Sequence, residues 1–326
     1  MGSEEKNMVE GQKCHGYITG NKLELYQERL LLDRRPITAQ FAISDHCNLN
    51  CHYCKYGIDS ERDKRLMSAS DFAECWLILR EIGTRAMVFS GTGEPTMNPE
   101  FPKMVEWLEA NRFPYGINTN MVKGIDFPVG NARFVKVNVD GTNQADYLKR
   151  KGVDAFDHVF HNVQRFVQKN PSVKVILQCV VEDAAHAQRF YKTWRKFGLP
   201  MSLRPIESMR PVYEKENLRR IIECLTELKK KDSLSGMSYK WAYVNTPKIA
   251  CGANWSIISV RPDMKVAYCC YKWDEIMGDI QDIHRIIEKR KVHRTKMNTC
   301  AVPCRLSGLN HYVGDYQTEH QDYEFI

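Results

Sequence analysis

Short apolar runs alternate with segments of helical spacing along residues 37–206. Runs that are apolar at nearly every position indicate strands buried on both faces, as in a parallel sheet. Apolar residues three or four positions apart indicate amphipathic helices. Because helical segments separate most of the runs, the pattern predicts βα units joined by right-handed crossovers. Six strands are expected, over residues 37–44, 86–90, 115–119, 134–140, 173–181 and 201–206.

The helices are predicted from their capping residues as well as from their spacing. Ser68, with Asp71 three residues later, marks the start of a helix that runs to about Ile82. Asn98 is expected to cap a second helix, because Pro99 then takes the first helical position, where proline is favoured. Further helices are expected over residues 155–169, 185–197 and 216–231.

Composition narrows the class of protein. The chain has 326 residues, of which 43% are hydrophobic, so it can form a substantial core. It contains no apolar run of about 18 residues and no apolar secretory signal near its start. We therefore expect a cytoplasmic protein with no membrane partner. The net charge of +7 suits a nucleic-acid partner. A solvated helix face at residues 285–296 explains the charge more simply, so this partner is not favoured.

Three of the twelve cysteines lie in one short loop directly after the first predicted strand. Cys47, Cys51 and Cys54 have the spacing C-x3-C-x2-C, which can present three thiolates to one iron–sulfur cluster. Such clusters are usually held by four thiolates, so three leave one iron open to a substrate, as in catalytic zinc sites. The alternatives are a zinc knuckle or three unrelated buried thiols.

The loop from Cys47 to Cys54 resembles the signature of the radical S-adenosylmethionine (SAM) superfamily. The resemblance implies a 4Fe-4S cluster whose open iron chelates SAM, with Tyr53 lying over the cofactor. It also implies a 5′-deoxyadenosyl radical that abstracts hydrogen from a substrate, after an electron arrives from a donor such as flavodoxin or ferredoxin. The predicted strands then fit an α/β fold, the (β/α)6 partial TIM barrel of that superfamily, over residues 37–210.

The turn after the second predicted strand strengthens this resemblance. This turn resembles the superfamily's Gly-Gly-Glu motif. It reads Gly91-Thr92-Gly93-Glu94, with Thr92 as an extra residue. The resemblance implies that the glycines let the backbone approach the SAM amino group and that Glu94 pairs with it. Alone, the turn is weak evidence, because any tight turn can use such a sequence.

Polar residues at the ends of later strands are further candidates for the site. Arg204 is a candidate to hold a carboxylate of SAM or of the substrate through bidentate contacts, or to form a structural ion pair. The asparagines and the aspartate among the others could equally be turn-forming residues. Candidates for hydrogen bonds to SAM are Asn118, Asn120, Asn138, Asp140 and Gln178.

A second group of cysteines occupies residues 251–304. Two strands about a turn are expected between them, over residues 257–261 and 265–269. The group resembles the Twitch or SPASM-type auxiliary-cluster modules, although Met264 stands where that pattern has a turn glycine. The resemblance implies a second 4Fe-4S cluster, and a structural zinc site is the alternative. The expected ligands are Cys251, Cys269, Cys300 and Cys304, with Cys270 as an alternative to Cys269.

These observations predict four segments and a reaction class. The second cluster would accept an electron from the substrate radical, so the resemblance implies a dehydrogenase-like oxidation of a small-molecule or compact substrate. Modification of a nucleotide, nucleic acid or peptide is the alternative, and a non-enzymatic zinc or iron–sulfur protein is a second one. The segments are an N-terminal extension (1–36), the barrel core (37–210), a bridging helix and linker (211–250) and a Twitch-like domain with the C-terminal tail (251–326).

Overall fold

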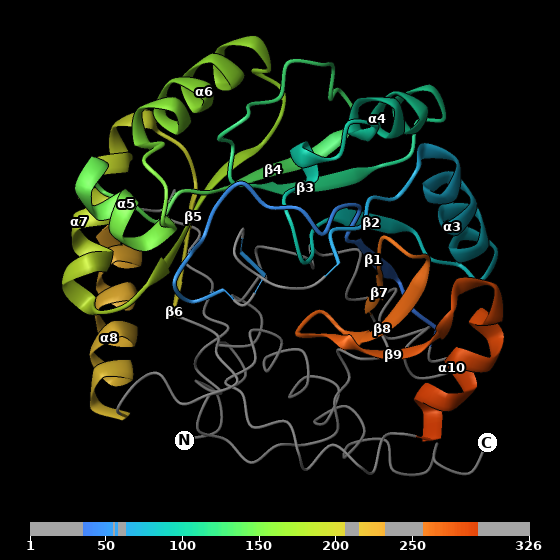
Figure 1. Ribbon diagram of the computed structural model, residues 1–326. Coiled ribbons are helices and arrows are strands. Elements are labelled where there is room, and N and C mark those ends of the chain that lie inside the picture. The colour runs from blue at the N-terminus through green and yellow to red at the C-terminus, as the bar shows by residue number, and fades with distance from the viewer. Residues whose placement is uncertain (1–34, 55, 58–62, 206–214, 232–256, 293–326) are drawn as a thin grey trace, which may run out of the picture.

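The computed structural model describes residues 35–54, 56–57, 63–205, 215–231 and 257–292. Their strands form one curved sheet in the order β6-β5-β4-β3-β2-β1-β7-β8-β9 (Figure 1). The strands are β1 (Thr38–Phe41), β2 (Ala86–Phe89), β3 (Tyr115–Thr119), β4 (Ala132–Asn138), β5 (Val175–Val181), β6 (Met201–Pro205), β7 (Ile257–Val260), β8 (Lys265–Cys269) and β9 (Lys272–Asp279).

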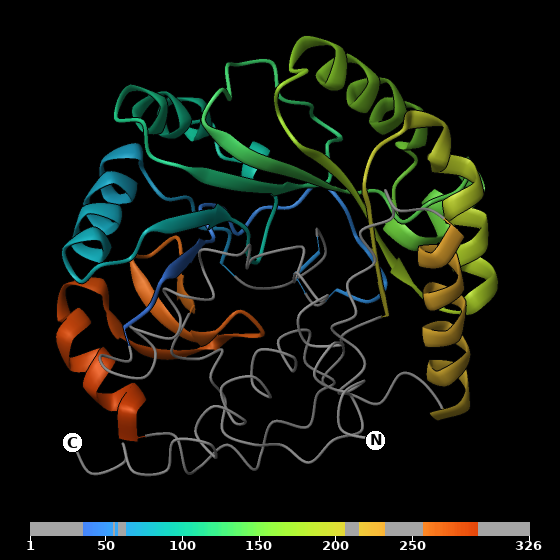
Figure 2. The same cartoon turned by 180° about the vertical axis from the view of Figure 1, so that it is seen from behind.

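Helices cover the convex side of this sheet, as the views from both sides show (Figures 1 and 2). Strands β1 to β6 are parallel, so each crossover must return along the outside of the sheet. All six predicted strands are present, with their ends shifted by a few residues. The helices are α3 (Ala69–Glu81), α4 (Phe101–Ala110), α5 (Gln144–Lys151), α6 (Phe156–Lys169), α7 (Ala184–Trp194), α8 (Lys215–Lys231) and α10 (Ile283–Val292), with 3-10 turns η1 (Pro95–Met97), η2 (Arg195–Phe197) and η3 (Ile280–Asp282).

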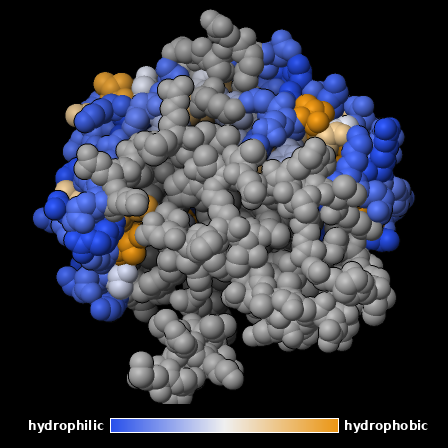
Figure 3. Space-filling model, turned by 90° about the horizontal axis from the view of Figure 1, so that it is seen from below, coloured by the Kyte–Doolittle hydropathy of each residue, from blue (hydrophilic) through white to orange (hydrophobic). Residues whose placement is uncertain are grey.

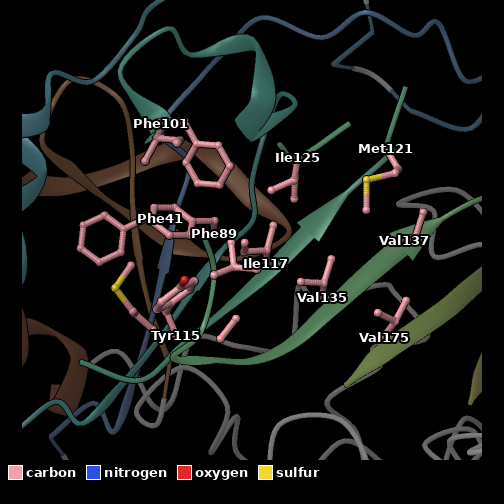
Figure 4. Close-up of a cluster of buried hydrophobic side chains, with 14 of the residues drawn as sticks. Phe41, Phe89, Phe101, Tyr115, Ile117, Met121, Ile125, Val135, Val137 and Val175 are labelled. Atoms are coloured by element: carbon pink, nitrogen blue, oxygen red, sulfur yellow. The ribbon is translucent and has the colours of Figure 1, made fainter. Parts of the chain in front are cut away.

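The core lies between the sheet and these helices (Figure 4). Alternate strand residues point outward and are apolar; Phe41, Phe89, Ile117 and Val135 are each completely buried. Burying a side chain of this size contributes about 1.5 to 3 kcal/mol. The residues between them point to the concave side, where polar residues such as Gln40 line a cavity. The same strands therefore build a core on one face and a polar lumen on the other.

The start of α4 differs from the prediction. The helix begins at Phe101, with Glu100 as its N-cap, so Asn98 does not cap it. The side-chain amide of Asn98 instead donates to the carbonyls of Ile43 (2.7 Å) and Met67 (2.8 Å), which fastens the segment after β1 to the start of α3. The side-chain oxygen of Asn98 also accepts from the backbone N–H of Glu100 (2.8 Å), so this one amide binds the chain before the helix as well.

Helix α5 was not predicted, although its ends carry recognisable signals. The Asn143 side chain accepts from the backbone N–H of Asp146 (2.9 Å), as an N-cap does. Gly152 ends the helix in the left-handed conformation, with φ +70°. The helix has only eight residues and follows β4 closely, so its short apolar stripe escaped the periodicity argument.

The predicted C-terminal hairpin joins the sheet of the barrel. Strand β7 pairs in parallel with β1, with Thr38 opposite Ile257, and β8 and β9 follow in antiparallel order. The third strand, β9, was not predicted. Met264, which replaces the turn glycine of the Twitch pattern, adopts the left-handed conformation that glycine favours, with φ +59°. Residues 257–292 therefore extend the barrel sheet beyond β1.

The described surface offers no large apolar face. Large apolar side chains that are more than two-fifths exposed occur singly, and the described rim seen in Figure 3 is mostly hydrophilic. Such isolated residues are normal for a globular surface. Among the described residues, no helix is long and apolar enough to span a membrane. The exposed residues are Leu66, Leu77, Leu148 and Ile276.

Candidate active site

A cavity opens at the carboxyl ends of the parallel strands, where α/β barrels place their sites. It is lined by the three cysteines that follow β1 and by most of the other residues predicted for the site. The predicted residues among its lining are Cys47, Cys51, Tyr53, Cys54, Gly91, Thr92, Gly93, Glu94, Asn118, Asn120, Asn138, Gln178, Arg204 and Cys270.

The three cysteines of the loop face this one cavity. Cys47 and Cys51 are partly buried and Cys54 is exposed. A backbone hydrogen bond from the Cys54 N–H to the Cys51 carbonyl (2.9 Å) folds the C-x2-C segment into a turn. Among the described residues, no three His, Cys, Asp or Glu side chains are placed to hold a single metal ion. The three thiols share one cavity, which is the arrangement that a cluster bound through three cysteines needs.

A side chain at Gly91 or Gly93 would clash with the segment that follows β1. A Cβ at Gly91 would lie 2.2 Å from the Cβ of Ala42, and one at Gly93 would lie 2.3 Å from the carbonyl oxygen of His46. The glycines were expected to let the backbone approach SAM. In the structure they let it approach the segment that leads into the cysteine loop. The N–H of Glu94 also donates to the His46 carbonyl (2.8 Å), so the turn and the loop are positioned together.

Glu94 is a buried carboxylate held by neutral donors. Its oxygens accept from the hydroxyls of Thr119 (2.6 Å) and Thr96 (2.9 Å) and from the backbone N–H of Asn120 (2.7 Å). Among the described residues, Glu94 forms no ion pair with a Lys, Arg or His side chain. Burial raises the pKa of Glu94, although these donors oppose the shift. The arrangement orients a carboxylate that a cationic ligand would stabilise.

Two further contacts join the cysteine loop to strand ends. The Thr92 hydroxyl donates to Asp45 just before the loop. The side-chain amide of Asn120, after β3, donates to the Asn48 side chain within the loop (2.7 Å). Thr92 and Asn120 line the cavity. Thr92 donates to the residue just before the loop, and Asn120 donates to a residue within it. These contacts limit how far the loop can move.

Asp140 departs from its predicted place. It is fully buried, does not line the cavity, and forms an ion pair with the equally buried Lys151 (Nζ to Oδ2, 2.7 Å). Burial by itself would raise the pKa of Asp140, but the Lys151 charge and hydrogen bonds lower it below the usual range. Instead of facing the cavity, where a SAM contact was predicted, this carboxylate binds Lys151, the Tyr53 hydroxyl and the backbone N–H of Val180.

The lumen contains polar residues that the sequence analysis missed. Three of the missed strand residues, Gln40, Lys136 and Ser202, lie at alternate positions that face the lumen, so a period of two was the available signal for them. Gln40 is almost completely buried, and within the described part of the chain neither polar atom of its side-chain amide has a hydrogen-bond partner. The strand residues among those missed are Gln40, Thr119, Lys136 and Ser202.

The second cysteine group is described only in part. Cys269 and Cys270 are both partly buried at the turn between β8 and β9. Cys270 lines the cavity, whereas Cys269 does not. The other three expected ligands lie outside the described residues; they are Cys251, Cys300 and Cys304.

Solved structures with a similar fold are found among SAM-binding proteins. SuiB of Streptococcus suis bound to the precursor peptide SuiA is 13% identical with a TM-score of 0.59, and the match covers 76% of this chain and 62% of that chain. The structure of anSMEcpe with bound AdoMet is 19% identical with a TM-score of 0.64, and 81% of each chain is covered. This chain thus spans less than two thirds of that SuiB chain, and at these identities the likeness shows the fold alone.

Sequence comparison identifies the central part of the chain. No curated protein matches. Residues 41–201 match the family described as Radical SAM superfamily. This stretch includes the three cysteines of the loop and the Gly91–Glu94 turn. The chain therefore carries a radical SAM superfamily domain on an α/β fold with a parallel-strand sheet.

Proposed function

We propose that the protein is a radical SAM enzyme that cleaves SAM reductively and abstracts hydrogen from a small or compact substrate. One observation supports it most directly: Cys47, Cys51, Cys54 and the buried carboxylate of Glu94 line the same cavity. Three thiolates leave one iron of a 4Fe-4S cluster open, and a carboxylate without a cationic partner among the described residues suits the SAM ammonium group.

The chain's own residues would bind and orient the reactants. When bound, the cluster would supply the electron that cleaves SAM to methionine and a 5′-deoxyadenosyl radical. Glu94 would accept hydrogen bonds from the SAM ammonium, in the orientation that Thr119 and Asn120 impose. Asn138 and Gln178 lie opposite each other on adjacent strands and line the cavity, and they would hydrogen-bond the ribose. Arg204 on β6 is the proposed contact for a carboxylate of SAM or substrate.

A second cluster in the C-terminal segment is part of the proposal. Its ligands would be Cys251, Cys300, Cys304 and one of the two cysteines of the β8–β9 turn. Because Cys270 lines the cavity and Cys269 does not, a cluster on Cys270 would face the substrate. It would accept the electron of a dehydrogenase-like oxidation. A flavodoxin or ferredoxin in the cytoplasm is the proposed donor for the first cluster.

A peptide is the second candidate substrate. Two of the solved structures with a similar fold hold peptides, namely SuiB with its precursor peptide SuiA and anSMEcpe with the Kp18Cys peptide. These likenesses concern the fold, so they favour a peptide as a class to be tested. Incubation with small molecules and with peptides, followed by detection of deuterium transfer from substrate into 5′-deoxyadenosine, would separate the two candidates.

The central test is the cleavage of SAM. Anaerobically reconstituted protein with dithionite should form 5′-deoxyadenosine, and the Cys47→Ala/Cys51→Ala/Cys54→Ala variant should form none, because the first cluster has no other ligands. A Cys75→Ala variant is the control, since Cys75 is buried in the core away from the cavity. SAM cleavage by the triple variant, or none by wild-type protein that holds its iron and sulfide, would overturn the proposal.

A further inference from the structure

The last turn of α5 lies directly against the cysteine loop. The backbone N–H groups of Asn50 and His52 donate to the carbonyls of Lys151 (2.8 Å) and Arg150 (3.2 Å). Carbonyls at a helix C-terminus have no partner within the helix, so the loop satisfies them. Gly152 permits this contact, because a Cβ there would lie 2.7 Å from the Asn50 carbonyl oxygen. The residues on both sides of the second cysteine, Cys51, are thus docked on a helix end.

A buried polar network continues from this contact to Tyr53. The Tyr53 hydroxyl donates to Oδ2 of Asp140, and Lys151 Nζ lies 3.1 Å from the same hydroxyl and 2.7 Å from Asp140 Oδ2. The other oxygen of Asp140 accepts from the backbone N–H of Val180 (2.7 Å) on β5. Tyr53 directly precedes Cys54, so this network ends at the third cysteine of the motif.

Asp140 occupies an unfavourable backbone conformation to make these contacts. Its φ is +58°, in the left-handed region that few residues other than glycine adopt, although aspartate adopts it more often than most. The conformation is fixed from several sides, since the Asp140 carbonyl also lies 2.8 Å from Nε2 of the buried His186. Backbone strain of this kind persists where the surroundings over-determine it, and it concentrates at functional sites.

A second connection holds the other side of the loop. His52 Nε2 lies 2.7 Å from Glu182 Oε1, and Glu182 Oε2 lies 2.9 Å from the buried Arg150. Arg150 is in turn held by Asp146 (2.8 Å), one turn earlier in α5. Adjacent residues of the loop, His52 and Tyr53, are therefore tied to adjacent residues of α5. The Tyr53 connection contains two fully buried charged groups, Asp140 and Lys151, and burial strengthens their interaction.

We propose that Asp140 and Lys151 are positioning residues, which hold Tyr53 and through it the Cys51–Cys54 turn in the geometry that binds the first cluster. This inference rests on the proposed function, because it assumes that the loop holds a cluster. The network aligns the loop before the cluster binds, as outer residues orient the direct ligands of a metal. None of the three side chains needs to touch iron for this role.

The test removes one hydroxyl group. Tyr53→Phe keeps the aromatic ring and deletes the bond to Asp140. Tyr115→Phe is the matched control, because the buried Tyr115 hydroxyl also donates to a carboxylate, Glu109 (2.5 Å), but at the opposite end of the strands. Both variants are reconstituted anaerobically, and iron release to a chelator and the electron paramagnetic resonance (EPR) spectrum of the reduced cluster are measured. Cys300→Ala/Cys304→Ala serves as the background, so that the first cluster alone is observed.

We expect Tyr53→Phe to release iron about 10- to 100-fold faster than Tyr115→Phe, as outer residues of metal sites do when altered. Its EPR spectrum should also differ from that of the wild type. Equal release rates and unchanged spectra in the two variants would overturn the inference. If the background protein binds no cluster at all, the proposed function fails instead, so the two failures are distinguishable.

A double variant separates positioning from folding. Asp140→Asn/Lys151→Met removes both buried charges together, which proteins tolerate far better than the loss of one. We expect this variant to fold, as judged by circular dichroism, and still to release iron faster than Tyr115→Phe. Iron release at the rate of the control would show that the pair stabilises the fold only, and would overturn the inference.

Discussion

Two buried carboxylates beside the cysteine loop have opposite surroundings. Asp140, after β4, is neutralised by Lys151, and the Tyr53 hydroxyl and a backbone N–H fill its remaining directions. Glu94, after β2, is held by hydroxyl and amide donors and has no cationic partner among the described residues. Only Glu94 lines the cavity. Asp140 therefore completes the protein's own structure, whereas Glu94 is the carboxylate that the proposed function assigns to the SAM ammonium group.

Removal of one charge from the pair should have the largest effect on stability. Lys151→Met leaves Asp140 buried without its counter-ion, so we expect the free energy of unfolding to fall by about 3 to 5 kcal/mol. Denaturant titration by circular dichroism measures this. Lys103→Met is the matched control, because Lys103 pairs with Glu100 on the surface (3.1 Å), where a pair contributes about 1 kcal/mol or less. Equal losses of stability in the two variants would show that the Asp140–Lys151 pair contributes no more than a surface pair, which would contradict this prediction.

Removal of the Glu94 charge should affect SAM binding more than folding. Glu94→Gln keeps the shape and deletes the charge, so we expect SAM affinity to fall about 10- to 100-fold, as for a lost hydrogen bond between charged groups of about 1.5 to 3 kcal/mol. Anaerobic equilibrium dialysis with labelled SAM measures it. Glu109→Gln, at the far end of the barrel, should bind SAM as the wild type does. If the Glu94→Gln variant binds SAM with unchanged affinity, Glu94 does not contact SAM.

The two carboxylates should also respond oppositely to pH. The pKa of Asp140 is lowered, so its stabilising contribution is present above the ordinary value of 3.8 and is lost as pH falls through the lowered value. The pKa of Glu94 is raised, so its contribution is complete below 4.5 and is lost as pH rises through the raised value. Relative to wild type without ligands, Glu94→Gln should therefore gain stability as pH rises, whereas Asp140→Asn should lose it. Unfolding titrations measure both trends, below about pH 5 for Asp140→Asn and above about pH 4 for Glu94→Gln, and parallel trends would contradict the comparison.

Local sequence was sufficient for elements whose signals are contained in a few residues. The six parallel strands were predictable because each is a short run rich in apolar residues, and segments of helical spacing separate most of these runs. The start of α3 at Ser68 was predictable because its cap lies three residues from the group it binds. The contacts of Asn98 could not be predicted in this way. Its side-chain amide binds the carbonyls of Ile43 and Met67, which lie more than 30 residues away along the chain.

The sequence by itself determined the order of strands, the three cysteines after the first of them and the turn that carries Glu94. Only the tertiary structure decided which polar residues share the cavity, because that depends on how far the sheet curves and which face each residue takes. In the structure Asp140 lies outside the cavity, because it pairs with Lys151 at the far end of helix α5. It also brought the β8–β9 turn with Cys270 to the cavity, because β7 pairs with β1 across more than 200 residues of chain. Such pairings depend on packing between distant segments, which no local pattern records.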